Sequence, residues 1–115
     1  MTSPRWHILR DGHAVTLARH LPVRMDLCVR ATLHAPTPVS RTALAHQIRQ
    51  DVWRALRRLR GFSPVVRVGH TGAAIAVEAG GRCAGPAGGA ADRIAGVLDN
   101  GANRRRWLAH AGRRS

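Results

Sequence analysis

The sequence predicts an α+β domain of two layers, a mixed and mainly antiparallel sheet with helices on one face. Three observations predict this class. One segment alternates between apolar and polar residues, which is typical of a half-buried strand. A longer segment repeats its apolar residues at helical spacing. Short apolar runs separated by glycine-containing turns flank both segments, so the expected order is β-β-β-α-β-β-α-α.

The first three strands are expected before residue 34. Residues 5–10 and 13–18 flank Asp11-Gly12, and this dipeptide between two apolar runs predicts a hairpin because glycine accepts a positive φ. Residues 23–33 follow as a strand with one buried face. The residues expected on that face are Val23, Met25, Leu27, Val29, Ala31 and Leu33.

A long amphipathic helix is expected next. Ser40 follows a proline-containing break and is a suitable N-cap, and Gly61 would end the helix at about Arg60. The apolar residues within one arc of the helix are Leu44, Ile48, Val52, Ala55, Leu56 and Leu59. The arginines opposite that arc are Arg49, Arg54, Arg57, Arg58 and Arg60. We expect this ridge of arginines to face outward.

A second hairpin and two helices complete the expected single domain of residues 1–115. Residues 64–68 and 73–79 flank a turn at 69–72, and a glycine-rich loop follows at 80–89. The two helices are expected at about 87–99 and 102–112, separated by Asn100-Gly101. The arginine-rich C-terminal helix and tail comprise residues 101–115, and the pair of helices loosely suggests a helix-turn-helix.

Positive charge is concentrated in two short segments. The chain of 115 residues has 19 basic residues, all of them arginine, against 6 acidic ones, giving a net charge of +13. Residues 41–60 and 101–115 each contribute +5, whereas residues 61–100 contribute 0. A coding bias toward GC explains arginine in place of lysine, but it does not explain the shortage of acids. The net charge therefore indicates a negatively charged partner.

Several function classes find little support. No motif brings two carboxylates together for acid–base catalysis, and the 7 histidines lack metal-ligand spacing, so we expect no enzyme, no metal and no cofactor. A ribonuclease that uses two histidines is a minor alternative. No apolar run is long enough to span a membrane, and the first residues contain no apolar stretch typical of a secretory signal, so we expect neither. The 2 cysteines suit a reducing compartment, so we expect a cytoplasmic location.

The expected function is non-enzymatic binding to the phosphate backbone of duplex or structured nucleic acid, DNA or RNA. Guanidinium groups match phosphate oxygens, and a polyanion releases counterions when arginines replace them. The expected binding residues are Arg49, Arg54, Arg57, Arg58, Arg60, Arg104, Arg105, Arg106, Arg113 and Arg114. With no tyrosine and one phenylalanine, a sheet that stacks bases is not expected, and we expect Trp53 and Trp107 to anchor helices to the core. The alternative is an accessory or adaptor subunit that docks on an acidic protein partner.

Overall fold

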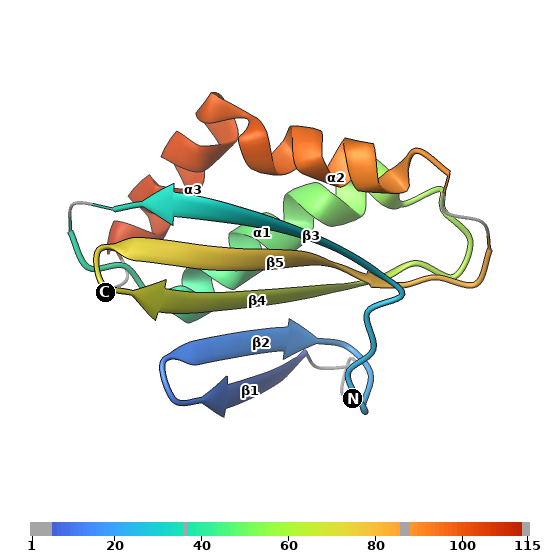
Figure 1. Ribbon diagram of the computed structural model, residues 1–115, viewed down its shortest axis with the longest axis horizontal. Coiled ribbons are helices and arrows are strands. Elements are labelled where there is room, and N and C mark those ends of the chain that lie inside the picture. Colours follow the sequence, from blue (N-terminus) through green and yellow to red (C-terminus); the bar gives the residue numbers. More distant parts are fainter. Residues whose placement is uncertain (1–5, 36, 86–87, 114–115) are drawn as a thin grey trace.

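The computed structural model describes residues 6–35, 37–85 and 88–113 and has the expected order of elements (Figure 1). The strands are β1 (His7–Asp11), β2 (Ala14–Ala18), β3 (Leu27–His34), β4 (Ser63–Thr71) and β5 (Ala74–Arg82). The helices are α1 (Arg41–Leu56), α2 (Ala90–Asp99) and α3 (Gly101–Arg113).

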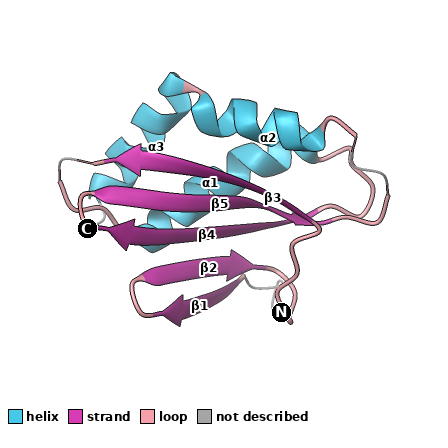
Figure 2. Ribbon diagram, in the orientation of Figure 1, coloured by secondary structure: helices cyan, strands magenta, loops and turns pink. Residues whose placement is uncertain are grey.

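The five strands form one sheet in the order β1-β2-β4-β5-β3. Every pair of neighbours is antiparallel, so the predicted α+β class is confirmed, with a wholly antiparallel sheet in place of a mixed one. The helices lie together on one side of the sheet, and the other side is open (Figure 2). None of the described helices is both long and apolar enough to cross a membrane.

The core lies between the sheet and the helices. The α1 residues Leu44, Ile48, Val52 and Leu56 are buried completely, as the helical spacing predicts. Trp107 of α3 is buried completely as well, so it anchors its helix as expected. Trp53, by contrast, is 43% exposed, and the expectation that it anchors α1 to the core is wrong.

The first helix begins as predicted and ends earlier than predicted. The Ser40 side chain accepts a hydrogen bond from the Ala43 amide at 3.1 Å, which caps the helix. The helix stops at Leu56 because tighter turns follow, with amide-to-carbonyl bonds from Leu59 to Leu56 and from Phe62 to Leu59. The turn then reverses at Gly61, whose φ is +67°.

The third strand is shorter than the alternating segment 23–33. It starts at Leu27, and from there the alternation holds, with odd-numbered residues toward the helices and Cys28, Arg30 and Thr32 exposed. Residues before it take another conformation because the Asp26 carboxylate pairs with Arg24 and accepts the Cys83 amide. Val23 is therefore exposed.

The second hairpin is longer than predicted at both ends. β4 and β5 pair through Thr71 and Ala74, so the turn is shorter than residues 69–72. β5 also takes in the first glycines of the segment predicted as a loop. A Cβ on Gly80 would lie 1.7 Å from the Leu27 carbonyl oxygen, so only glycine lets β3 and β5 approach this closely here.

Candidate nucleic-acid interface

The turn after α1 carries three of the predicted binding residues. Arg57, Arg58 and Arg60 are exposed, and within the described part of the chain none of their side chains has a hydrogen bond or ion pair. These three side chains project from a tight turn and not from a face of the helix, because α1 ends at Leu56. Their three positive charges are available to an external anion.

The side chains of Arg49 and Arg54, both on α1, lie in different surroundings. The Arg54 side chain is 65% exposed, and its Nη1 lies 3.5 Å from Oδ1 of Asp51. Arg49 is half-buried, and its guanidinium carbon lies 4.8 Å from the centroid of the Trp6 ring. The two arginines of the expected ridge that lie on α1 therefore differ in exposure and in partner, although the charge of Arg54 still lowers the pKa of Arg49.

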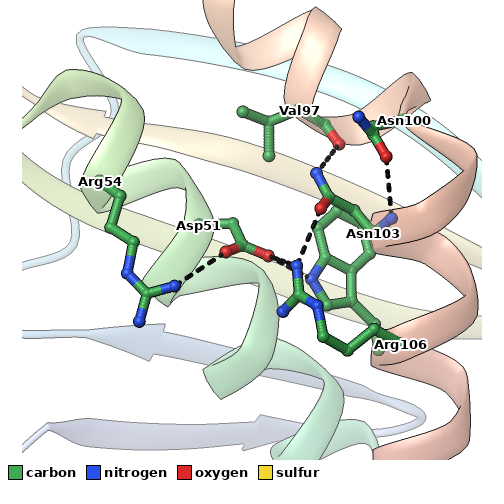
Figure 3. A network of polar contacts seen from close by, with 7 residues as sticks. Asp51, Arg54, Val97, Asn100, Asn103 and Arg106 are labelled. Atoms are coloured by element: carbon green, nitrogen blue, oxygen red, sulfur yellow. Dashed lines mark hydrogen bonds and ion pairs between the residues drawn. The ribbon is translucent and has the colours of Figure 1, made fainter.

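Arg106 belongs to a polar network inside the helical layer (Figure 3). Its Nη2 donates to Oδ2 of Asp51 at 2.6 Å and to Oδ1 of Asn103 at 2.8 Å. The same Asp51 oxygen accepts the indole N–H of buried Trp107 at 2.7 Å. Arg106 thus helps to join α3 to α1, and much of its charge is matched within the molecule.

Arg104 is engaged by the fold in a similar way. Its Nε donates to the Leu98 carbonyl at 2.6 Å and its Nη1 to the Thr32 carbonyl at 3.2 Å, which ties the start of α3 to α2 and β3. A third contact reaches Asp99 at 3.4 Å. Arg105 is exposed and has no ion pair among the described residues. Of this arginine triplet, it is therefore Arg105 that offers an unmatched charge to a groove.

The last two predicted residues lie at the end of the chain. Arg113 is the final residue of α3, and its side chain lies outside what the structure describes. Arg114 is outside the described residues altogether. Their assignment to the interface stays a prediction.

A pocket of about 610 Å³ lies where the end of β2, α1 and the start of β4 meet. The residues that line it are Trp6, Arg19, His20, Arg49, Trp53, Gly61, Phe62, Ser63, Pro64 and Arg82. We call it the tryptophan–arginine pocket. Two of the 3 tryptophans of the chain and its 1 phenylalanine line this pocket. No carboxylate is among its described lining residues.

Two guanidinium groups of the pocket, those of Arg19 and Arg49, have no ion pair within the described residues. Both lie over the same Trp6 ring, with carbon-to-centroid distances of 5.8 and 4.8 Å, respectively. Burial lowers the pKa of Arg49, and the charges of Arg19 and Arg54 lower it further. Its Nε is buried with no hydrogen-bond partner in the described part of the chain. An unsatisfied buried donor costs about 1–3 kcal/mol, so an acceptor bound here would be stabilised.

The open face of the sheet has a hollow of about 410 Å³, and its charges are balanced. Arg30 Nε lies 2.9 Å from the Glu78 carboxylate, and Arg67 Nε lies 3.8 Å from it. Arg67 also lies 3.9 Å from Asp11. Anions are therefore attracted less to this face than to the tryptophan–arginine pocket.

The described residues offer little for metal binding or for thiol chemistry. Within residues 6–35, 37–85 and 88–113, no group of three or more His, Cys, Asp or Glu side chains could hold a metal ion. Desolvation raises the pKa of the Cys28 thiol, and Glu78 raises it further, which reduces the fraction of reactive thiolate. Guanidinium groups beside aromatic rings are the chemically distinctive feature of the described surface.

Comparison with known proteins adds no further assignment, since no family model, no curated protein and no solved structure matches the chain.

Sequence reasoning missed most of the tryptophan–arginine pocket. Trp6 precedes β1, Arg19 follows β2 and Arg82 ends β5, so the pocket joins segments far apart in the chain. No spacing pattern links these residues. The available signal was Trp53, which falls between the apolar arc and the arginines of the helix.

Proposed function

We propose that the protein binds nucleic acid through unpaired arginines around the C-terminal end of α1, in a non-enzymatic role. One observation carries this proposal. The acids Asp11, Asp26, Asp51, Glu78 and Asp99 each lie within 4.0 Å of an arginine, whereas Arg57, Arg58 and Arg60 have no partner within the described residues. Internal pairing therefore uses most of the acids and leaves this turn unneutralised.

Phosphate is the anion that this arrangement suits. Guanidinium groups donate two parallel hydrogen bonds to phosphate oxygens, and their charge is permanent. The turn leads at Gly61 directly into the tryptophan–arginine pocket, so both can contact one extended ligand.

The expected cytoplasmic location stays a prediction.

The test is a salt titration. Labelled duplex DNA, duplex RNA and single strands are titrated with the full chain at several salt concentrations. Engaging six to eight phosphates of duplex DNA predicts a log–log slope of roughly −5 to −7. Absence of binding to every nucleic acid at about 50 mM salt would overturn the proposal and favour the acidic protein partner instead.

Two variants of equal charge locate the interface. The double variant Arg57→Gln/Arg58→Gln should reduce the magnitude of the duplex slope by about 0.9 per lost phosphate contact. The control is Arg10→Gln/Arg93→Gln, which removes two exposed arginines of β1 and α2 that also lack ion pairs in the described structure. Equal weakening by both doubles would show that net charge alone drives binding and would remove the turn from the interface.

A further inference from the structure

The tryptophan–arginine pocket places guanidinium groups beside the exposed surface of an indole ring. Trp53 is one of its lining residues and is 43% exposed. Arg19, Arg49 and Arg82 line the same space, and no carboxylate is among its described lining residues, although Arg82 lies near enough to Asp26 to lower the pKa of that carboxyl group. A volume of about 610 Å³ falls within the roughly 300–1,000 Å³ of small-ligand pockets.

The two tryptophans have different roles in this pocket. Trp6 is already in contact with two guanidinium groups and packs against the core with part of its surface. Trp53 has no such contact in the described structure and is among the exposed large hydrophobic residues. Trp53 therefore offers the ring on which a flat ligand could stack.

One guanidinium donor of the pocket lacks an acceptor in the described part of the chain. The Arg49 Nε is buried without a partner in the described residues, although the rest of its guanidinium group contacts Trp6. Burial and the charge of Arg19 both lower the pKa of Arg49, so an anion next to it would relieve an unfavourable interaction. An acidic peptide would supply the anion but no ring for Trp53.

A nucleotide supplies both an anion and an aromatic ring. We propose that the tryptophan–arginine pocket takes one unpaired nucleotide, whose base stacks on Trp53 and whose phosphate contacts Arg49 and Arg19. The pocket deepens the proposed function and rests on it, because the neighbouring turn would hold the adjoining backbone phosphates. The ligand is then a structured nucleic acid with a nucleotide outside its helix.

Three duplexes of one sequence test the pocket with the full chain. One is blunt, one carries a single unpaired nucleotide, and one carries an abasic residue at the same place. The unpaired nucleotide should raise the affinity roughly 5- to 150-fold over the blunt duplex, the range that one stacked base provides. The abasic residue should give no such gain. Equal affinity for all three duplexes would overturn the pocket while leaving the proposed function intact.

Variants of the stacking residue sharpen the test. Trp53→Ala should abolish the gain from the unpaired nucleotide, measured as the ratio of the affinities of this variant for the bulged and the blunt duplex, and the fold should persist because Trp53 is 43% exposed. Trp53→Phe should retain part of the gain. A full gain in Trp53→Ala would contradict the assignment.

A mononucleotide titration separates failure of the pocket from failure of the proposed function. A nucleoside monophosphate should quench tryptophan fluorescence saturably in the wild type and much less in Trp53→Phe. Inorganic pyrophosphate, which lacks a base, should compete without quenching. Absence of Trp53-dependent quenching would overturn the assignment of the pocket to a nucleotide, whether or not a polynucleotide binds. If a poly-glutamate peptide displaces the nucleotide and pyrophosphate does not, the pocket would instead be assigned to an acidic protein.

Discussion

The indole N–H of Trp107 donates a 2.7 Å hydrogen bond to the carboxylate of Asp51, which joins α3 to α1 beneath the surface of the helical layer. Trp107 is 0% exposed, so its N–H has no access to water. The same carboxylate oxygen accepts Arg106 at 2.6 Å. One acidic side chain thus satisfies a buried donor and neutralises one of the predicted binding arginines.

Asp51→Ala should lower the free energy of unfolding by about 1–3 kcal/mol, because the buried Trp107 donor loses its acceptor. Asp51→Asn retains an acceptor oxygen and should cost less. Chemical denaturation measures both changes. In the double variant Asp51→Ala/Trp107→Phe the loss should be smaller than the sum of the single losses, and strict additivity would show that the two side chains are not coupled.

Gly80→Ala should destabilise the sheet strongly. The added Cβ would lie 1.7 Å from the Leu27 carbonyl oxygen, and two paired strands would have to separate to admit it. We expect a loss of about 3 kcal/mol or more in the free energy of unfolding, at the upper end of overpacking effects. Gly96→Ala in α2 is the control, since nothing lies within 4 Å of its added Cβ. There the better helix propensity of alanine should raise stability by up to about 1 kcal/mol, and equal behaviour of the two variants would refute the close approach at Gly80.

His46 should make the fold less stable in mild acid. Burial lowers its pKa below the ordinary value, and the charge of Arg49 lowers it further. The folded state therefore binds this proton less readily than the unfolded chain does. Stability should fall as the pH drops below about 6.5, the unfolded value, and level off below the folded pKa.

Urea denaturation across pH 5–7.5 measures this dependence. His46→Gln should flatten the fall that begins near pH 6.5, and the matched variant His34→Gln, which removes an exposed imidazole of β3, should preserve it. A wild-type profile that rises toward acid in this window would contradict the direction of the His46 shift.

The fold was predictable where neighbouring residues determine structure. Asp11-Gly12 predicts the first hairpin and Ser40 the start of α1, because turns and caps depend on a few consecutive residues. The end of α1 was not predictable from the apolar arc, since Leu59 keeps the helical spacing in a tighter turn. The partners of Arg104 and Arg106 were hidden for a related reason. Thr32 and Asp51 are distant in sequence, and only the packing of α3 brings them near.

We expect Arg49 to contribute to nucleic-acid affinity and to contribute little to the free energy of unfolding. Its unsatisfied Nε costs about 1–3 kcal/mol, whereas a cation–π contact such as that with Trp6 returns about 0.5–2 kcal/mol. The net contribution of the Arg49 guanidinium group to the stability of the unbound protein is therefore close to zero or unfavourable. Arg49→Met keeps a similar length of apolar chain without the charge, so the free energy of unfolding should stay unchanged or rise by up to about 2 kcal/mol.

The affinity of the same variant should move in the opposite direction. Arg49→Met should weaken binding of a duplex that carries an unpaired nucleotide more than binding of the blunt duplex, because Arg49 lies in the pocket and not in the neighbouring turn. Denaturation and salt titration of one preparation measure both effects. A destabilisation above about 1 kcal/mol would show that Arg49 serves the fold, since the net cost of its unmet hydrogen bond would then be smaller than the contact with Trp6.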